Sequence, residues 1–112
     1  MDARSEAVAR EVKAALALAY GDRLAAVYAF GSRARGDFHA ESDLDLAVVL
    51  RDPPIPLTRA DDALIEVTYP IELNSGLVIH AWSLSADAMG DNIPQGFRAK
   101  LVDTVRREGL PI

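Results

Sequence analysis

The 112-residue chain contains no cysteine, which excludes disulfides, thiolate metal sites and cysteine nucleophiles. It also lacks a long hydrophobic segment. No uninterrupted apolar run exceeds seven residues, as in Leu24–Phe30, whereas a membrane-spanning helix needs roughly 20. No apolar stretch typical of a signal peptide follows Met1 and Asp2. From these absences we expect a soluble, cytoplasmic protein.

Basic residues are fewer than acidic ones, with 12 Lys and Arg against 17 Asp and Glu, and the formal net charge is −5. Non-specific binding of DNA or RNA depends on a clustered positive field, so we expect no direct nucleic-acid binding. The rest of the composition is that of an ordinary globular protein, 50% hydrophobic and 26% charged. We therefore expect a single domain over residues 1–112, which buries roughly two-thirds of its unfolded-chain surface.

Hydrophobic periodicity predicts alternating helices and strands. Apolar residues at every fourth position predict a helix over Ser5–Tyr20. Three apolar runs predict buried strands, over Leu24–Phe30, Leu44–Leu50 and Leu77–Leu84. The segment Gly31–Ser42, rich in Gly, Ser and Arg, is expected to be a loop. With two later helices, the order predicts an α/β arrangement around a small sheet.

The two later helices are marked by shorter signals. Thr58 followed three residues later by Asp61 resembles a capping box and predicts a helix start. We expect this helix to be kinked or broken at Pro70, because proline lacks the N–H that a helix interior uses. Pro94 stands where the first turn of the last helix would tolerate it, and Gly109 is expected to end that helix.

Two carboxylates stand at the mouth of the second predicted strand. Alternation along a strand puts Asp43 and Asp45 on one face, with Cα atoms about 6.5 Å apart. Carboxylates this close repel each other unless a cation lies between them, and hard oxygen ligands suit Mg²⁺. An isolated acidic pair is also a common solvated strand start, so the pair gains meaning only from its context.

A glycine–serine turn follows the first predicted strand. Gly31 permits a close backbone approach, and the N–H groups of such a turn form a concavity for anions. The Ser32 hydroxyl can donate to a phosphate oxygen, and the Arg35 guanidinium can fork onto phosphate. Arg33 could be a second phosphate contact, or could pair with Glu41 or solvent. A phosphate-binding turn next to metal-binding carboxylates is the combination that nucleotidyl transfer requires.

These residues resemble the nucleotidyltransferase superfamily with the DNA-polymerase-β-type palm. The matching segments are Phe30–Gly36 (FGSRARG) and Ser42–Leu46 (SDLDL). They look most like the minimal nucleotidyltransferases, antitoxins that are often encoded beside a HEPN-domain toxin. The resemblance implies an α/β (α+β) fold, with a small mixed sheet and helices packed on one face. It also implies ATP, Mg²⁺ and transfer of a nucleoside monophosphate to a hydroxyl.

The resemblance also implies roles for individual residues and for a partner. It makes Asp43 and Asp45 catalytic metal ligands, and it makes Gly31, Ser32 and Arg35 nucleotide-binding residues. A single domain leaves no second domain to hold an acceptor, so the acceptor hydroxyl should arrive on a partner protein. In the systems that this chain resembles, the acceptor is a tyrosine of the HEPN toxin. A homo-oligomer formed through exposed apolar surface also remains open.

The chain departs from the family pattern at the third strand, where the family often carries a third carboxylate. No Asp or Glu occurs between Asn74 and Ser85, and the aligned position is His80. His80 could act as base or ligand, could be structural, or Glu72 or Glu66 could supply the missing acid. The alternative function is a weak or inactive nucleotide-binding antitoxin that neutralises its partner by binding alone.

Overall fold

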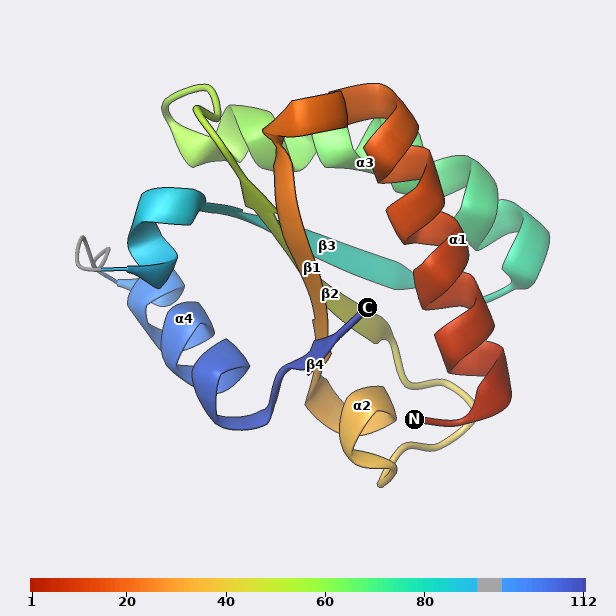
Figure 1. The fold of residues 1–112 in the computed structure, drawn as a ribbon. Helices are drawn as coiled ribbons and strands as arrows, with labels where there is room; N and C mark the ends of the chain where they lie inside the picture. Colours follow the sequence, from red (N-terminus) through yellow and green to blue (C-terminus); the bar gives the residue numbers. More distant parts are fainter. Residues whose placement is uncertain (91–95) are drawn as a thin grey trace.

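The computed structural model describes residues 1–90 and 96–112, which form a small sheet with helices packed around it (Figure 1). The helices are α1 (Ala3–Tyr20), α2 (Gly31–Arg35), α3 (Leu57–Ser75) and α4 (Phe97–Glu108), with 3₁₀ turns at η1 (Gly21–Arg23) and η2 (Ala86–Met89). The strands are β1 (Leu24–Phe30), β2 (Leu44–Leu50), β3 (Ile79–Ser85) and β4 (Leu110–Pro111). The predicted α/β fold class is confirmed, and the first two strands have their predicted bounds.

The four strands form one mixed sheet in the order β3-β2-β1-β4. Strand β1 is antiparallel to both β2 and β4, whereas β2 and β3 are parallel. A parallel pair needs a crossover connection, and α3 supplies it between β2 and β3. Strand β2 is therefore central, with β1 on one side of it and β3, an edge strand, on the other.

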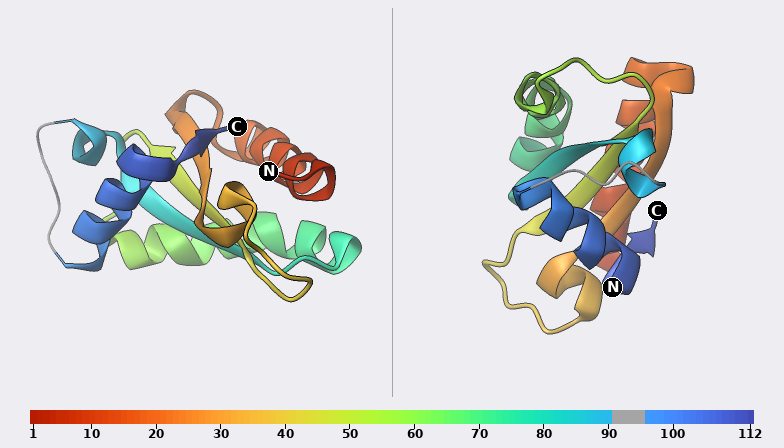
Figure 2. Two further views of the ribbon diagram at one scale, coloured as in Figure 1. Left: turned by 90° about the horizontal axis from the view of Figure 1, so that it is seen from below. Right: turned by 90° about the vertical axis from the view of Figure 1, so that its left-hand side faces the viewer.

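Helices cover both faces of the sheet, which corrects the expectation that they pack on one face. Alternate residues of β2 point in opposite directions. Leu46 and Val48 join the core beneath α1 and α3, whereas Ala47 and Val49 join a second core with α4. Figure 2 shows α3 and α4 on opposite sides of the sheet. Because β2 is apolar on both faces, both need cover from water.

The segment expected to be a loop over Gly31–Ser42 begins as a helix. Helix α2 follows β1 directly and ends at Gly36, whose φ of 93° is left-handed and whose N–H bonds to the Ser32 carbonyl at 2.9 Å. Five residues are too few to show an apolar period, so the sequence pattern could not reveal this helix.

Helix α3 corrects two details of its prediction. Of the two outcomes predicted at Pro70, a kink or a break, the break is wrong, because one helix runs through the proline. Thr68 and Ile71 on either side of the proline are buried, and Ile71 packs in the core; such packing supplies most of a helix's stability. The predicted capping box is wrong, because Pro56 occupies the N-cap without a side-chain hydrogen bond. Asp61 instead accepts a hydrogen bond from the Ser83 N–H at 2.8 Å.

The last helix begins at Phe97, and its predicted end at Gly109 is confirmed. Pro94, the expected first-turn proline, lies outside the described residues. Within residues 1–90 and 96–112, no helix is both long enough and apolar enough to cross a membrane.

Helix α1 offers a matched test of core packing. Leu16 is fully buried, whereas Leu18 on the same helix is 90% exposed. We expect Leu16→Ala to lower the free energy of unfolding by about 2–5 kcal/mol, because it leaves a cavity in the core. Leu18→Ala should change it by less than about 0.5 kcal/mol. Urea unfolding followed by circular dichroism measures both, and equal effects would contradict this account of the core.

Candidate functional site

Two aspartates and a histidine converge at the end of β2 and β3. Asp45 and His80 are cross-strand partners in the parallel ladder, and Asp43 precedes β2 by one residue. His80 Nδ1 lies 3.4 Å from Asp43 Oδ2 and 3.8 Å from Asp45 Oδ1. The three side chains are 36%, 27% and 48% exposed for Asp43, Asp45 and His80. Both acids and His80 therefore lie side by side, as the strand pattern predicts, and their catalytic and metal-binding roles remain predictions.

Local packing explains why the aspartates face outward together. Leu44 and Leu46 alternate with them along β2 and are fully buried beneath α1 and α3. A slip of one residue in register would expose both leucines and bury both carboxylates. The hydrophobic core therefore fixes the direction of the acidic pair.

Gly31 brings the glycine–serine turn directly against this pair. Strand β1 ends at Phe30, which is the cross-strand partner of Asp45. Gly31 has a φ of 79°, and a Cβ placed on it would lie 2.5 Å from Asp45 Oδ2. Any larger residue would therefore clash with the carboxylate in a conformation that L-residues rarely adopt. The start of α2 thus lies directly against Asp45, and Ser32 is the next residue of this helix.

The two arginines of the turn have different surroundings. Arg33 is 2% exposed, and its guanidinium donates to the carbonyls of Ser42 and Ala40 and to the Ser5 hydroxyl. It also lies over the Phe38 ring, with Cζ 4.6 Å from the centroid. Neither alternative predicted for Arg33, a phosphate contact or pairing with Glu41 or solvent, is correct. Arg33 instead holds the loop that leads into Asp43.

Arg35 is half-exposed at the rim of the turn, and carboxylates contact it. Its guanidinium donates to Glu108 at 3.0 Å and to Asp37 at 3.3 Å. The same Glu108 oxygen also accepts from the Gly31 N–H at 3.3 Å. A carboxylate thus occupies the position between Gly31 and Arg35 where a phosphate oxygen was expected. An anion does fit this part of the turn.

Glu108 is the functional candidate that sequence reasoning missed. One signal was available, because Glu108 is the last residue of α4, where the helix dipole disfavours negative charge. An acid in that position needs a compensating contact, and here Arg35 and the Gly31 N–H provide it.

The electrostatics of the acidic pair centre on Asp45. Burial raises the pKa of Asp45 above its ordinary value, and repulsion from Asp43 adds to this shift. His80 and Arg35 act in the opposite direction. Holding two carboxylates together beside the core therefore has a cost that a bound cation would offset.

The residues present fit a hard divalent cation such as Mg²⁺. Carboxylate oxygens are its preferred ligands, and Asp43 and Asp45 face one position with His80. Within the described part of the chain, however, no group of three or more acidic or histidine side chains is arranged to hold a metal ion by itself. Such a cation would complete its coordination with oxygens from a ligand or water.

Neither glutamate considered as a third acid joins this cluster. The Glu72 carboxylate accepts the Ile79 N–H at 2.8 Å. Glu66 lines a different cavity, together with Tyr20 and Arg23. His80 is therefore the residue of the third strand that faces the acidic pair.

A mixed sheet that brings an acidic pair against a glycine turn is the arrangement expected of a domain that transfers phosphate-linked groups. Residues 9–94 match the family described as the nucleotidyltransferase domain. This match spans most of the chain, and the chain belongs to that family.

Two solved structures are similar to this chain to different extents. One, assigned as a minimal nucleotidyltransferase, is 26% identical, with a TM-score of 0.56 and coverage of 100% of this chain and 97% of that chain. The other, assigned as a nucleotidyltransferase from Sulfolobus solfataricus, is 22% identical, with a TM-score of 0.47 and coverage of 79% and 78%. No curated protein sequence matches the chain significantly.

The raised pKa of Asp45 gives a pH-dependent prediction. A raised pKa means that ionising the Asp45 carboxyl costs the folded state free energy. This cost is absent at low pH, where the carboxyl is protonated, and appears as the pH rises through the raised pKa. Asp45→Asn should therefore raise Tm at pH 7 by about 2–4 °C, and the gain should vanish below about pH 4. Thermal melts in EDTA, with Asp103→Asn as an exposed control, measure this difference. A lower Tm for Asp45→Asn at pH 7 would contradict the prediction.

Proposed function

We propose that the chain is an antitoxin that transfers AMP from ATP to a hydroxyl on a HEPN-domain toxin. The observation that carries the proposal is the contact of the Gly31 turn with an acidic pair that also faces His80. Membership of the nucleotidyltransferase family supports the reaction class. The finer assignments of nucleotide, acceptor and partner rest on the resemblance of the two motifs and on the residues discussed below.

The turn after β1 would bind the triphosphate. The Gly31 N–H and the Arg35 guanidinium already hold a carboxylate oxygen, so they can hold a phosphate oxygen in the same way. The Ser32 hydroxyl can donate to a neighbouring oxygen. Mg²⁺, when held by Asp43 and Asp45, would neutralise negative charge on the phosphates.

The transfer step needs a group that accepts the proton of the attacking hydroxyl. The hydroxyl oxygen bonds to the α-phosphorus, the bond from that phosphorus to the bridging oxygen breaks, and pyrophosphate leaves. His80 Nδ1 faces both carboxylates, so Nε2 is the nitrogen left to accept the hydroxyl proton. Neutral imidazole suits this role near neutral pH.

The partner assignment rests on resemblance. The described residues form one sheet with its covering helices. The structural similarity to a minimal nucleotidyltransferase extends over the full length of this chain. A HEPN-domain toxin is the partner that this class of protein implies.

The transfer can be tested by the mass of the partner. Co-expressed HEPN-domain protein should gain whole adenylate units with wild-type chain, and Asp43→Asn should slow this gain at least 100-fold, because one metal-binding carboxylate is lost. Asp103→Asn, an exposed change on α4, should retain the activity. Intact-mass spectrometry measures the modification. Unchanged partner mass with wild-type chain would overturn the transfer reaction.

A second candidate is neutralisation by binding alone. Two observations favour it: histidine stands where the family often has a third acid, and no three-ligand metal group occurs among the described residues. In that case the partner would keep its unmodified mass, and wild-type and Asp43→Asn chains would neutralise it equally.

The contact of Glu108 with Gly31 and Arg35 predicts how a change at Glu108 alters the affinity for ATP. Glu108→Gln keeps an oxygen near Gly31 and Arg35 but removes the negative charge that competes with phosphate. We expect it to bind ATP with Mg²⁺ about fivefold more tightly, a change that corresponds to about 1 kcal/mol of screened charge interaction. Calorimetric titration measures this, with Asp103→Asn as control. Weaker ATP binding by Glu108→Gln would show that the carboxylate assists the site.

A further inference from the structure

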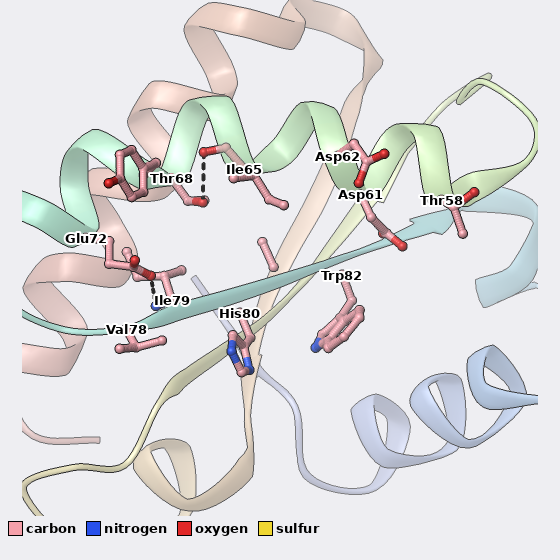
Figure 3. Close-up of a pocket in the computed structure, with 12 residues that line it drawn as sticks. Thr58, Asp61, Asp62, Ile65, Thr68, Glu72, Val78, Ile79, His80 and Trp82 are labelled. Carbon is pink, nitrogen blue, oxygen red and sulfur yellow. Dashed lines mark hydrogen bonds between the residues drawn. The ribbon is translucent and has the colours of Figure 1, made fainter.

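A cavity lies between α3 and the edge strand β3 and reaches the proposed active site. Its volume is about 480 Å³, within the range of small ligand sites. His80 is part of its lining, so the cavity and the acidic pair share a side chain. Figure 3 shows α3 along one side of the cavity and the β3 side chains His80 and Trp82 along the other.

The cavity lining is apolar with acidic groups and contains no Lys or Arg among the described residues. Ile65, Val78 and Trp82 supply apolar surface. Asp62 and Glu72 supply carboxylates. Asp61 also lines the cavity, but its charge is balanced by Arg98 at 2.5 Å. This surface suits a group that is partly apolar and positively charged, and it disfavours an anion.

The backbone of β3 limits the shape of the occupant. The Ile79 N–H is bonded to Glu72, and the Ser83 N–H is bonded to Asp61, both at 2.8 Å. Ala81 lies between them, and alternation points its N–H and carbonyl in the same outward direction. A partner strand could not form a continuous ladder along this edge, because the outward N–H groups on either side of Ala81 are already bonded to α3. The cavity therefore suits a compact segment centred on one residue.

Strand order shows which reactant would reach this cavity. The glycine turn follows β1, the acids stand on β2 and His80 stands on β3, and these strands lie side by side. In-line displacement places the attacking and leaving oxygens on opposite sides of the phosphorus. If the phosphates bind at Gly31, as proposed above, pyrophosphate would leave on the side of β1. The attacking hydroxyl would then arrive from the side of β3, whose His80 lines the cavity.

We propose that this cavity binds the acceptor, a protein segment whose hydroxyl-bearing residue is flanked by lysine or arginine. This assignment rests on the proposed transfer function. It goes beyond that function by specifying that the residues next to the acceptor hydroxyl are positively charged. The hydroxyl would reach His80 while the basic neighbours lie near Asp62 and Glu72.

The test uses two capped peptides that contain one tyrosine, flanked either by lysines or by glutamates. Trp82 is the chain's single tryptophan and lines the cavity, so its fluorescence reports on occupancy. We expect the lysine peptide to change this fluorescence and to bind at least tenfold more tightly than the glutamate peptide. Equal binding of the two peptides would overturn the proposal.

Two variants on α3 provide a matched pair. Asp62 lines this cavity, whereas Glu66 lines the separate cavity near Tyr20, and both are exposed. Asp62→Lys should weaken binding of the lysine peptide at least fivefold, and Glu66→Lys should weaken it less than twofold. Equal effects, or a loss of ATP binding caused by Asp62→Lys, would assign the cavity to something other than the acceptor.

The peptide-binding test is independent of the adenylate-transfer test, because peptide binding is measured without ATP. Peptide selectivity without adenylate on the partner would leave the cavity assignment in place and overturn the transfer reaction. Adenylate transfer without peptide selectivity would overturn only the cavity assignment.

Discussion

Strand β2 is hydrogen-bonded on both edges and buried on both faces, and the geometry of the candidate site depends on this double constraint. Its register with β1 sets Gly31 against Asp45, and its register with β3 sets His80 beside Asp45. Leu44 and Leu46 hold the acids on the outer side of the strand. Because these contacts converge on one strand, a register shift on either side would separate the turn from the acids or the acids from the histidine.

Features that depend on local pattern could be predicted from the sequence. The bounds of β1 and β2 follow from apolar runs, and the shared face of Asp43 and Asp45 follows from strand alternation. The contact partners of Arg33 and Glu108 could not be predicted, because these contacts join distant segments. Arg33 reaches Ser5, 28 residues away, and Glu108 reaches Gly31, 77 residues away. Only the packed sheet and helices bring these groups together.

The FGSRARG segment contains two arginines whose contacts differ because one is buried and the other is half-exposed. Arg33 is enclosed and donates to two carbonyls and a hydroxyl, which gives the following loop a fixed path. Two residues later, the guanidinium of Arg35 stays half-exposed and contacts the carboxylates of Asp37 and Glu108. Helix α2 therefore carries both a buried arginine that fixes the path of the loop toward Asp43 and a half-exposed arginine at the candidate site.

Bonds from α3 to the outward N–H groups of Ile79 and Ser83 have a consequence for the behaviour of the protein in concentrated solution. An uncovered strand edge is a template for intermolecular sheet growth. Here two carboxylates occupy alternate donors along β3 and leave only Ala81 between them. The chain thereby keeps a strand edge beside its candidate site without offering neighbouring molecules a continuous ladder from which fibrils could grow.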